Sequence, residues 1–93
     1  MTLPQHLLPV LAVLQRAYPG NVPSVDYYPL LVVLQEDMSA RNLAAVVAEL
    51  VDGETAVVDN DAAAAVSVRR PPPRDVERVR THLLSNGWIP EED

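Results

Sequence analysis

The densest group of side chains that could bind a ligand is a run of arginines near the end of the chain. Within residues 69–80 only Asp75 and Glu77 oppose them, so this stretch is net positive in a chain of formal charge −6. A guanidinium group binds phosphate or carboxylate through paired N–H donors. The stretch therefore contains candidate contacts for RNA, a phosphate ligand or an acidic protein partner. These candidate contacts are Arg69, Arg70, Arg74 and Arg78.

A second interpretation makes the same stretch an ordinary surface helix laced with ion pairs. Residues three positions apart face each other on a helix. Opposite charges have this spacing in Arg74–Glu77, Asp75–Arg78 and Glu77–Arg80. No aromatic residue interleaves with the arginines, so the stacking surface of single-stranded nucleic-acid binders is missing. We therefore favour ion pairs over a ligand site.

Arg80 is expected to have a structural role. It lies beside Leu83 and Leu84 on the face of the predicted last helix, and a charge so close to an apolar stripe is not buried unpaired. Its stem should lie along the apolar surface while its head reaches a carboxylate. Glu77 is the nearest acid in sequence, and an acid of another helix, such as Asp26, is an equally good candidate.

No catalytic, cofactor-binding or metal site is expected. His6 and His82 are the only conventional proton-transfer groups near neutral pH, and neither has a partner nucleophile at a recognisable spacing. Both are predicted to be surface side chains. The acidic cluster does not follow the ligand spacing of a calcium-binding loop, and loop charges or a helix cap explain it better. Its members are Asp52, Glu54, Asp59 and Asp61. The chain is therefore not expected to be an enzyme.

Composition indicates one small folded domain, residues 1–93. Hydrophobic residues make up 48% and charged residues 22% of the chain, and there is no Phe and no Cys, so the core must consist of Leu, Val and Ala. The negative charge disfavours nucleic acid and anionic membranes as partners of the whole surface. No basic leader and no apolar stretch of membrane-spanning length is present, so a cytoplasmic location is expected.

Apolar residues recur at helical spacing between the prolines, which predicts an all-α protein: a compact single-domain bundle of five short helices. The first helix should span residues 3–18, with Pro9 on its outer face. The alternative treats the residues before Pro9 as a lead-in and begins the helix at that proline. The second helix should be capped by Ser24 or Asp26, with Pro29 in its first turn. It is apolar all round over residues 30–34 and should be the buried centre.

The middle of the chain leaves one element open. A third helix should begin after Ser39 and stop at Gly53. Residues 54–68 fit either a short helix or a β-hairpin of two strand-like runs. The short helix would run through Val66, and Asp59, Asn60 or Asp61 would cap it. We favour the helix, because four alanines have high helix propensity and no hairpin turn joins the two runs.

The last helix should begin at Pro73, after a stiff spacer of two prolines, and end at Asn86–Gly87. A left-handed Gly87 would place Trp88 against Leu83. This role makes Trp88 a core residue rather than an anchor for a partner. The same preference applies to Tyr27 and Tyr28, and residues 89–93 are expected to be a short acidic tail.

Two stretches together carry a resemblance to a known family. They are the Tyr-Pro…Val-Pro…Asp-Tyr…Pro-Leu run over residues 18–30, and Asp-Val-Glu-Arg-Val-Arg over residues 75–80 followed by Asn86-Gly87-Trp88. The chain resembles a family of small proteins of unknown function from mycobacteria and related actinobacteria. The resemblance implies a bundle of five α-helices, and it implies no activity.

These observations favour a small, monomeric, intracellular protein-interaction or regulatory module without catalysis. The alternative is a binder of nucleic acid or a phosphate ligand that uses residues 69–80. Nucleic acid is the less favoured partner, since the domain is acidic and lacks a nucleic-acid-binding signature.

Overall fold

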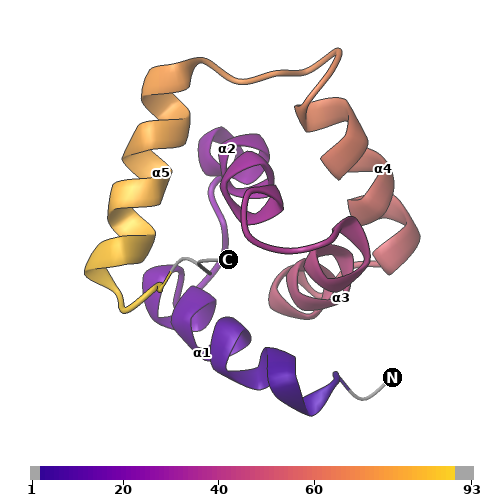
Figure 1. The fold of residues 1–93 in the computed structure, drawn as a ribbon, viewed down its shortest axis with the longest axis vertical. Helices are drawn as coiled ribbons and strands as arrows, with labels where there is room; N and C mark the ends of the chain where they lie inside the picture. Colours follow the sequence, from indigo (N-terminus) through magenta and orange to yellow (C-terminus); the bar gives the residue numbers. More distant parts are fainter. Residues whose placement is uncertain (1–2, 90–93) are drawn as a thin grey trace.

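The apolar stretches between the prolines form helices. The structure, a computed structural model, describes residues 3–89, and over these residues it contains five α-helices and no strand (Figure 1). This confirms the expected fold class. No helix within residues 3–89 combines the length and the apolar character needed to cross a membrane. The helices are α1 (Leu8–Ala17), α2 (Ser24–Gln35), α3 (Ala40–Val51), α4 (Thr55–Ala65) and α5 (Pro73–Ser85), and a 3-10 turn over Gln5–Leu7 precedes α1.

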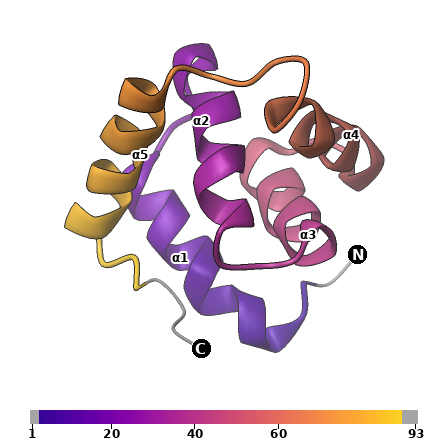
Figure 2. The same ribbon diagram turned by 45° about the horizontal axis from the view of Figure 1, so that its top comes forward.

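The central helix is α2, as its continuous apolar sequence predicted. It contacts α3, α4 and α5, while α1 packs against α3 and α5 (Figures 1 and 2). Leu30, Leu31 and Leu34 are completely buried. Each such side chain contributes roughly 1.5–3 kcal/mol by leaving water. The rest of the core is Leu, Val and Ala, together with Tyr18 and Trp88.

The start of α1 follows the alternative interpretation rather than the preferred one. The α-helix begins at Leu8, so Pro9 occupies its first turn, where a missing N–H costs nothing. The preceding 3-10 turn is closed by a 3.0 Å bond from the Leu7 amide to the Pro4 carbonyl. A regular helix over residues 3–18 was therefore wrong, because the proline starts the helix instead of bending it.

The cap of α2 also differs from the prediction. Pro23 occupies the N-cap position, and no side chain caps the helix. The Asp26 amide bonds to the Pro23 carbonyl at 2.9 Å, while the Asp26 side chain turns into the protein. Pro29 lies in the second turn rather than the first, so α2 lacks the bond that an amide there would make to the Val25 carbonyl.

Both ends of α3 lie where they were predicted, and the Ser39 cap is confirmed. The Ser39 hydroxyl accepts from the Asn42 amide at 3.2 Å, as expected of an N-cap serine. At the other end the left-handed residue is Asp52, with φ of 55°, and not the glycine after it. The Gly53 amide then reaches back to the Ala48 carbonyl at 2.8 Å.

Residues 55–65 form a helix, so the hairpin alternative was wrong. The helix begins at Thr55, before the expected cap residues, and Glu54 occupies the N-cap position without a side-chain bond. Val58, Ala62 and Ala65 form its buried stripe at helical spacing. These side chains form the inner face of α4.

The last helix matches the prediction at both ends. Pro73 is its first residue, and Gly87 adopts a left-handed φ of 97° after it. The Trp88 amide bonds to the Leu83 carbonyl at 2.9 Å, and the Gly87 amide bonds to the Leu84 carbonyl at 3.2 Å, which is the Schellman pattern. The cap buries Trp88 in the core. The predicted tail lies largely outside the described residues, since only Ile89 of it is included.

Candidate functional site

The five arginines of residues 69–80 separate into two groups. Arg78 and Arg80 project from α5 and pair with carboxylates at the two ends of α2. The other group forms no ion pair with any carboxylate of residues 3–89. It consists of Arg69, Arg70 and Arg74, and we call residues 69–74 the basic loop. This segment runs from the connection between α4 and α5 into the first turn of α5, along one edge of the bundle, in orange at the top of Figure 1.

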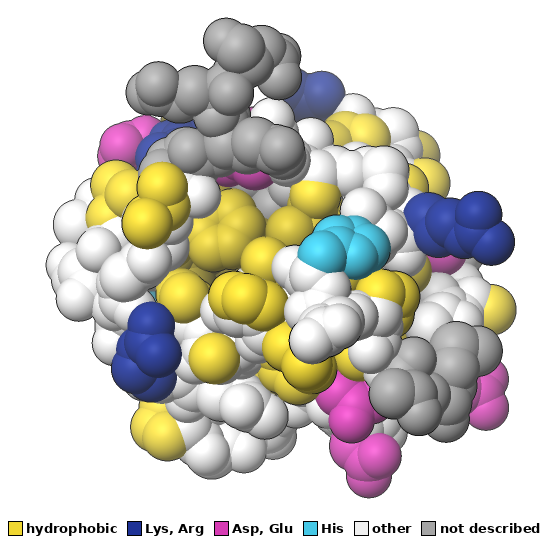
Figure 3. Space-filling view, turned by 60° about the horizontal axis from the view of Figure 1, so that its bottom comes forward, with side chains coloured by type: hydrophobic (Ala, Val, Ile, Leu, Met, Phe, Trp, Pro, Cys, Tyr) yellow, Lys and Arg dark blue, Asp and Glu magenta, His cyan; other side chains and the backbone are white. Residues whose placement is uncertain are grey.

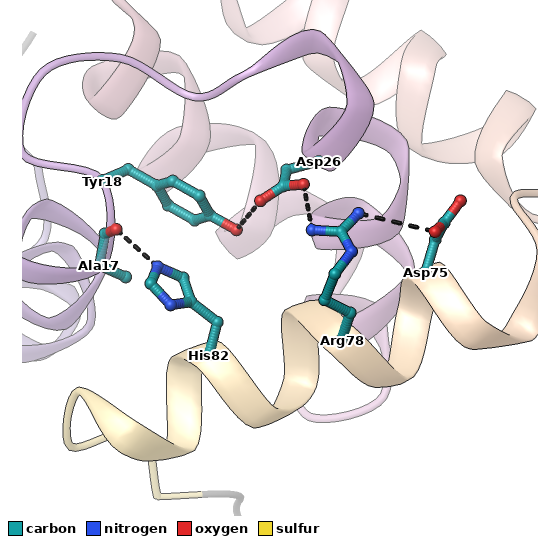
Figure 4. A network of polar contacts seen from close by, with 6 residues as sticks. All are labelled: Ala17, Tyr18, Asp26, Asp75, Arg78 and His82. Carbon is teal, nitrogen blue, oxygen red and sulfur yellow. Dashed lines mark hydrogen bonds and ion pairs between the residues drawn. The ribbon is translucent and has the colours of Figure 1, made fainter.

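The pairing of Arg78 is built around a buried carboxylate. Asp26 is 7% exposed, and one of its oxygens accepts from the Arg78 guanidinium at 2.6 Å. Its other oxygen accepts from the Tyr18 hydroxyl at 2.9 Å (Figure 4). Asp75 lies 3.7 Å from the same guanidinium, which confirms one of the predicted pairs along α5. Among the candidate contacts, the structure thus sets Arg78 apart as a residue that neutralises a buried charge.

Two tyrosines are held in their protonated form by this packing. Burial raises the pKa of the Tyr18 hydroxyl, and the hydrogen bond to Asp26 raises it further. Burial likewise raises the pKa of Tyr27, whose hydroxyl donates to Asp61 at 2.7 Å. The hydrogen bond to Asp26 raises the pKa of Arg78. Each of these protons is already part of a structural hydrogen bond.

Arg80 is the structural ion-pair residue that its position predicted. Its guanidinium donates to both oxygens of Glu36, at 2.6 and 2.8 Å, and also pairs with Glu77. Asp26 was wrong as its partner from another helix, because that carboxylate is taken by Arg78. The predicted pair between Arg74 and Glu77 is not present in the described part of the chain.

His82 and Arg16 join the C-terminal ends of α5 and α1 reciprocally. His82 is exposed, as expected, but its Nε2 lies 2.7 Å from the Ala17 carbonyl at the end of α1 (Figure 4). In return, Arg16 donates two bonds, of 3.0 and 3.2 Å, to the Asn86 carbonyl at the end of α5. Gly87 is favoured by its left-handed φ, and a Cβ there would lie 2.9 Å from the Arg16 guanidinium, which would have to shift away from its present position.

The basic loop has its own environment. The Arg69 guanidinium carbon lies 6.0 Å from the centre of the Tyr28 ring, within the range of a cation–π contact. Arg70 donates to the Val66 carbonyl at the end of α4, at 2.8 Å. Arg74 is exposed in the first turn of α5. The sequence around Arg69 does not predict its contact with Tyr28. The two residues lie far apart in the chain, one in the basic loop and the other in α2.

An apolar depression lies against the basic loop. It has a volume of about 270 Å³, and Arg70, Glu77 and Arg80 lie among its lining residues. The apolar part of the lining comes from α2, the end of α4, the loop and α5. These residues are Val32, Ala65, Val66, Pro71, Pro73 and Val76. The loop therefore combines unneutralised cations with an apolar recess.

A second apolar region lies on another face. Figure 3 shows hydrophobic side chains gathered around a hollow on this face, with a histidine close by. The corresponding depression has a volume of about 430 Å³ and is lined by Leu7, Val10, Met38 and Trp88, with His6 and Asp37 also present. No arginine occurs among its described lining residues.

The remaining candidates do not assemble into a chemical site. Within residues 3–89 no three His, Asp or Glu side chains come close enough to hold a metal ion. Of the acidic cluster, Asp61 accepts from Tyr27, while Asp52 forms the left-handed end of α3. Tyr27 and Tyr28 are half-buried and pack edge to face, with ring centres 5.3 Å apart.

One important residue could have been found from the sequence. Asp26 lies four positions before Leu30 and eight before Leu34, so helical spacing places its side chain on the buried face of α2. An acid on such a face needs a cationic or hydrogen-bonding partner. Assigning Asp26 to a helix cap hid this signal.

The fold and these contacts define a small protein that is all-α over the described residues, with a basic loop at one edge and an apolar recess beside it, between α2, the end of α4 and α5. Comparison with known protein families identifies the family of this chain. It belongs to the family described as "Protein of unknown function (DUF3349)", whose model matches residues 5–92. No curated protein and no solved structure was found to match it.

Proposed function

We propose that this protein is a small, monomeric, non-catalytic interaction module, and that the basic loop contacts a protein partner. The observation that carries the proposal is the division of the arginines. Arg78 and Arg80 are neutralised by carboxylates of the chain, whereas Arg69, Arg70 and Arg74 are not, although the chain carries net charge −6. Cations that remain unpaired in an acidic protein are available to an anionic partner.

The position of Arg74 adds support. It is the second residue of α5, where the helix macrodipole favours negative charge. A cation there opposes helix stability by roughly 0.3–1 kcal/mol at low ionic strength. The stability of the fold therefore gives no reason for an arginine at this position, whereas binding would.

Protein is a better partner for this surface than nucleic acid. Binding to nucleic acid depends heavily on Lys and Arg side chains that neutralise many phosphates. The loop offers three unpaired guanidinium groups, because the chain's own carboxylates take Arg78 and Arg80. The apolar recess beside the loop also suits a protein side chain better than a phosphate backbone.

The absence of catalysis is part of the proposal. Tyr18, Tyr27, Arg78 and Arg80 have raised pKa values, and each of these groups is held in a hydrogen bond or ion pair within the fold. None of them is paired with a nucleophile. The cytoplasmic location expected from the sequence stays a prediction.

The test is capture of partners by the tagged full chain from the native cell lysate. A variant with Arg69, Arg70 and Arg74 all changed to Gln should lose proteins that the natural sequence retains. Arg41→Gln is the matched control, because Arg41 is an exposed arginine on α3 and away from the loop. Retention of the same proteins by the triple variant would reject the loop as the contact surface. Salt-sensitive retention on immobilised RNA that is lost in the triple variant would favour the nucleic-acid alternative.

A further inference from the structure

We infer that the partner presents an acidic segment carrying one apolar side chain, which enters the recess between the end of α4 and α5 while its carboxylates contact Arg69, Arg70 and Arg74. This inference rests on the proposed function and states the chemistry of the partner. It follows from the shape of the recess, the charges at its rim and the backbone of the loop.

The size and lining of the recess fit an apolar side chain of the partner. Its volume of about 270 Å³ has room for an aliphatic side chain of a partner. Val32, Val66 and Val76 come from three different helices or helix ends and line it together. Val66 is 39% exposed, so part of this apolar surface remains in water without a partner. A branched aliphatic side chain would cover it.

The charges around the recess favour carboxylates in the partner. On the α5 side, Arg80 pairs with both Glu77 and Glu36, so no unpaired cation remains on that side. On the loop side, Arg70 borders both this recess and a more open depression lined by Val25 and Tyr28. The excess positive charge therefore lies on one rim only. An acidic segment that follows this rim would place its carboxylates next to the loop.

Arg69 is already oriented for such a contact. Its guanidinium lies toward the face of the Tyr28 ring. A guanidinium held near a ring by a cation–π contact still has N–H groups that can bind a carboxylate. Less side-chain entropy is then lost on binding, because the arginine is partly held in place beforehand.

The backbone of the loop excludes strand addition as the binding mode. Residues 71–73 are consecutive prolines, which have no N–H to donate to an added strand. The same prolines hold the loop in an extended, stiff form. Recognition must therefore come from side chains, which agrees with an apolar anchor and flanking carboxylates.

The test uses fluorescence anisotropy with the full chain and synthetic peptides rich in Asp and Glu, each carrying a single Leu, Ile, Val or Met. Each peptide has two matched probes, one with Ala replacing the apolar residue and one with Asn and Gln replacing the acids. At low ionic strength, the best acidic peptide should bind roughly tenfold more tightly than its Ala counterpart, since the lost methyl and methylene groups were buried. Its amide counterpart should bind at least as weakly as the Ala peptide.

Protein variants locate the contact. Val66→Thr keeps the shape of the side chain but makes the recess polar, and it should remove most of the preference for the apolar peptide. Val68→Thr is the matched control, because Val68 is 86% exposed on the same segment and does not line the recess. It should leave the preference unchanged. Thermal melts of both variants confirm that the fold is intact.

Each contrary outcome has a distinct meaning. Equal affinity for the apolar and Ala peptides would overturn the anchor, while loop-dependent capture of proteins would leave the proposed function standing. Peptide binding that the triple arginine variant retains would overturn the inference and count against the loop as a contact surface. A dimer detected by sedimentation and abolished in the triple variant would identify a second copy as the occupant and overturn the inference. Tighter binding of a short single-stranded RNA would do the same in favour of nucleic acid.

Discussion

Arginine has two different roles before and after Asp75. On the body of α5, Arg78 and Arg80 reach carboxylates at opposite ends of α2 and help to hold the two helices together. In the basic loop and the first turn of α5, the guanidinium groups contact a ring, a carbonyl oxygen or solvent, and no carboxylate of residues 3–89 neutralises them. The difference arises from the surroundings, because the residue type is the same.

This difference shows that local spacing alone does not determine whether a charge is satisfied. The i,i+3 pattern treats Arg74, Arg78 and Arg80 alike, and two of its three pairs are present. What separates them is the carboxylate that another helix brings to the same place. Only Arg78 and Arg80 lie where α5 crosses α2.

The largest effect should come from the buried carboxylate. Asp26→Ala should lower the free energy of unfolding by about 2–3 kcal/mol, because the buried Tyr18 hydroxyl loses its acceptor and Arg78 loses its partner. Asp75→Ala, which removes the longer contact to the same guanidinium, should cost clearly less. Urea denaturation of both variants measures the difference, and equal losses would show that Asp26 has no special role.

The other α5 arginine should have a smaller effect. Arg80→Ala should cost about 1 kcal/mol, because Glu36 and Glu77, which it leaves unpaired, are both well exposed and can be solvated. Chemical denaturation at low and high salt measures this loss, which should shrink as salt screens the pairs. A loss as large as that of Asp26→Ala would mean that exposure does not determine the strength of these pairs.

Alkaline pH should lower the stability of the folded protein by ionising Tyr18 and Tyr27. The pKa values of Tyr18 and Tyr27 are raised in the folded protein, so the unfolded chain loses these protons first. The stabilisation is complete below about pH 10, and each tyrosine should contribute a loss of about 1 kcal/mol by pH 11. The decline in melting temperature above pH 10 should be smaller in Tyr18→Phe. An identical decline in that variant would contradict the role assigned to Tyr18.

The smallest effect should come from the basic loop. Arg74→Gln should change the free energy of unfolding by no more than about 0.5 kcal/mol, and in the stabilising direction, since it removes a cation from the N-terminus of α5. Denaturant titration at low ionic strength gives the sign. A clear loss of stability would mean that Arg74 has a structural partner, and it would weaken the case for this loop as a binding surface.

Features that depend on neighbouring residues were predictable from the sequence. The Ser39 cap, the Pro73 start and the Gly87–Trp88 end each depend on bonds within one turn of a helix. The buried centre of α2 followed from its apolar composition. Arg80 was recognised as an ion-pair residue because its position beside leucines demanded a carboxylate.

Features that depend on a distant partner were not predictable in this way. Asp26 was assigned to a cap because an acid near a helix start usually caps it, yet Tyr18 and Arg78 meet it from two other segments. The Tyr28 contact of Arg69 and the recess beside the loop require α2, α4 and α5 to be placed relative to one another. The starts of α1 and α4 were misjudged for a local reason, since prolines and acids are compatible with more than one position in the first turn.

The reciprocal contacts of Arg16 and His82 have a consequence for folding. They link residues 70 and 65 positions apart in a chain of 93 residues, so most of the chain must close into a ring before either contact can form. The entropy of closing such a ring grows only slowly with its length, but no stretch of chain within it can make these contacts alone. The first and last helices therefore belong to one cooperative unit. Opening either end of the ring exposes the last carbonyls of both helices to water at once.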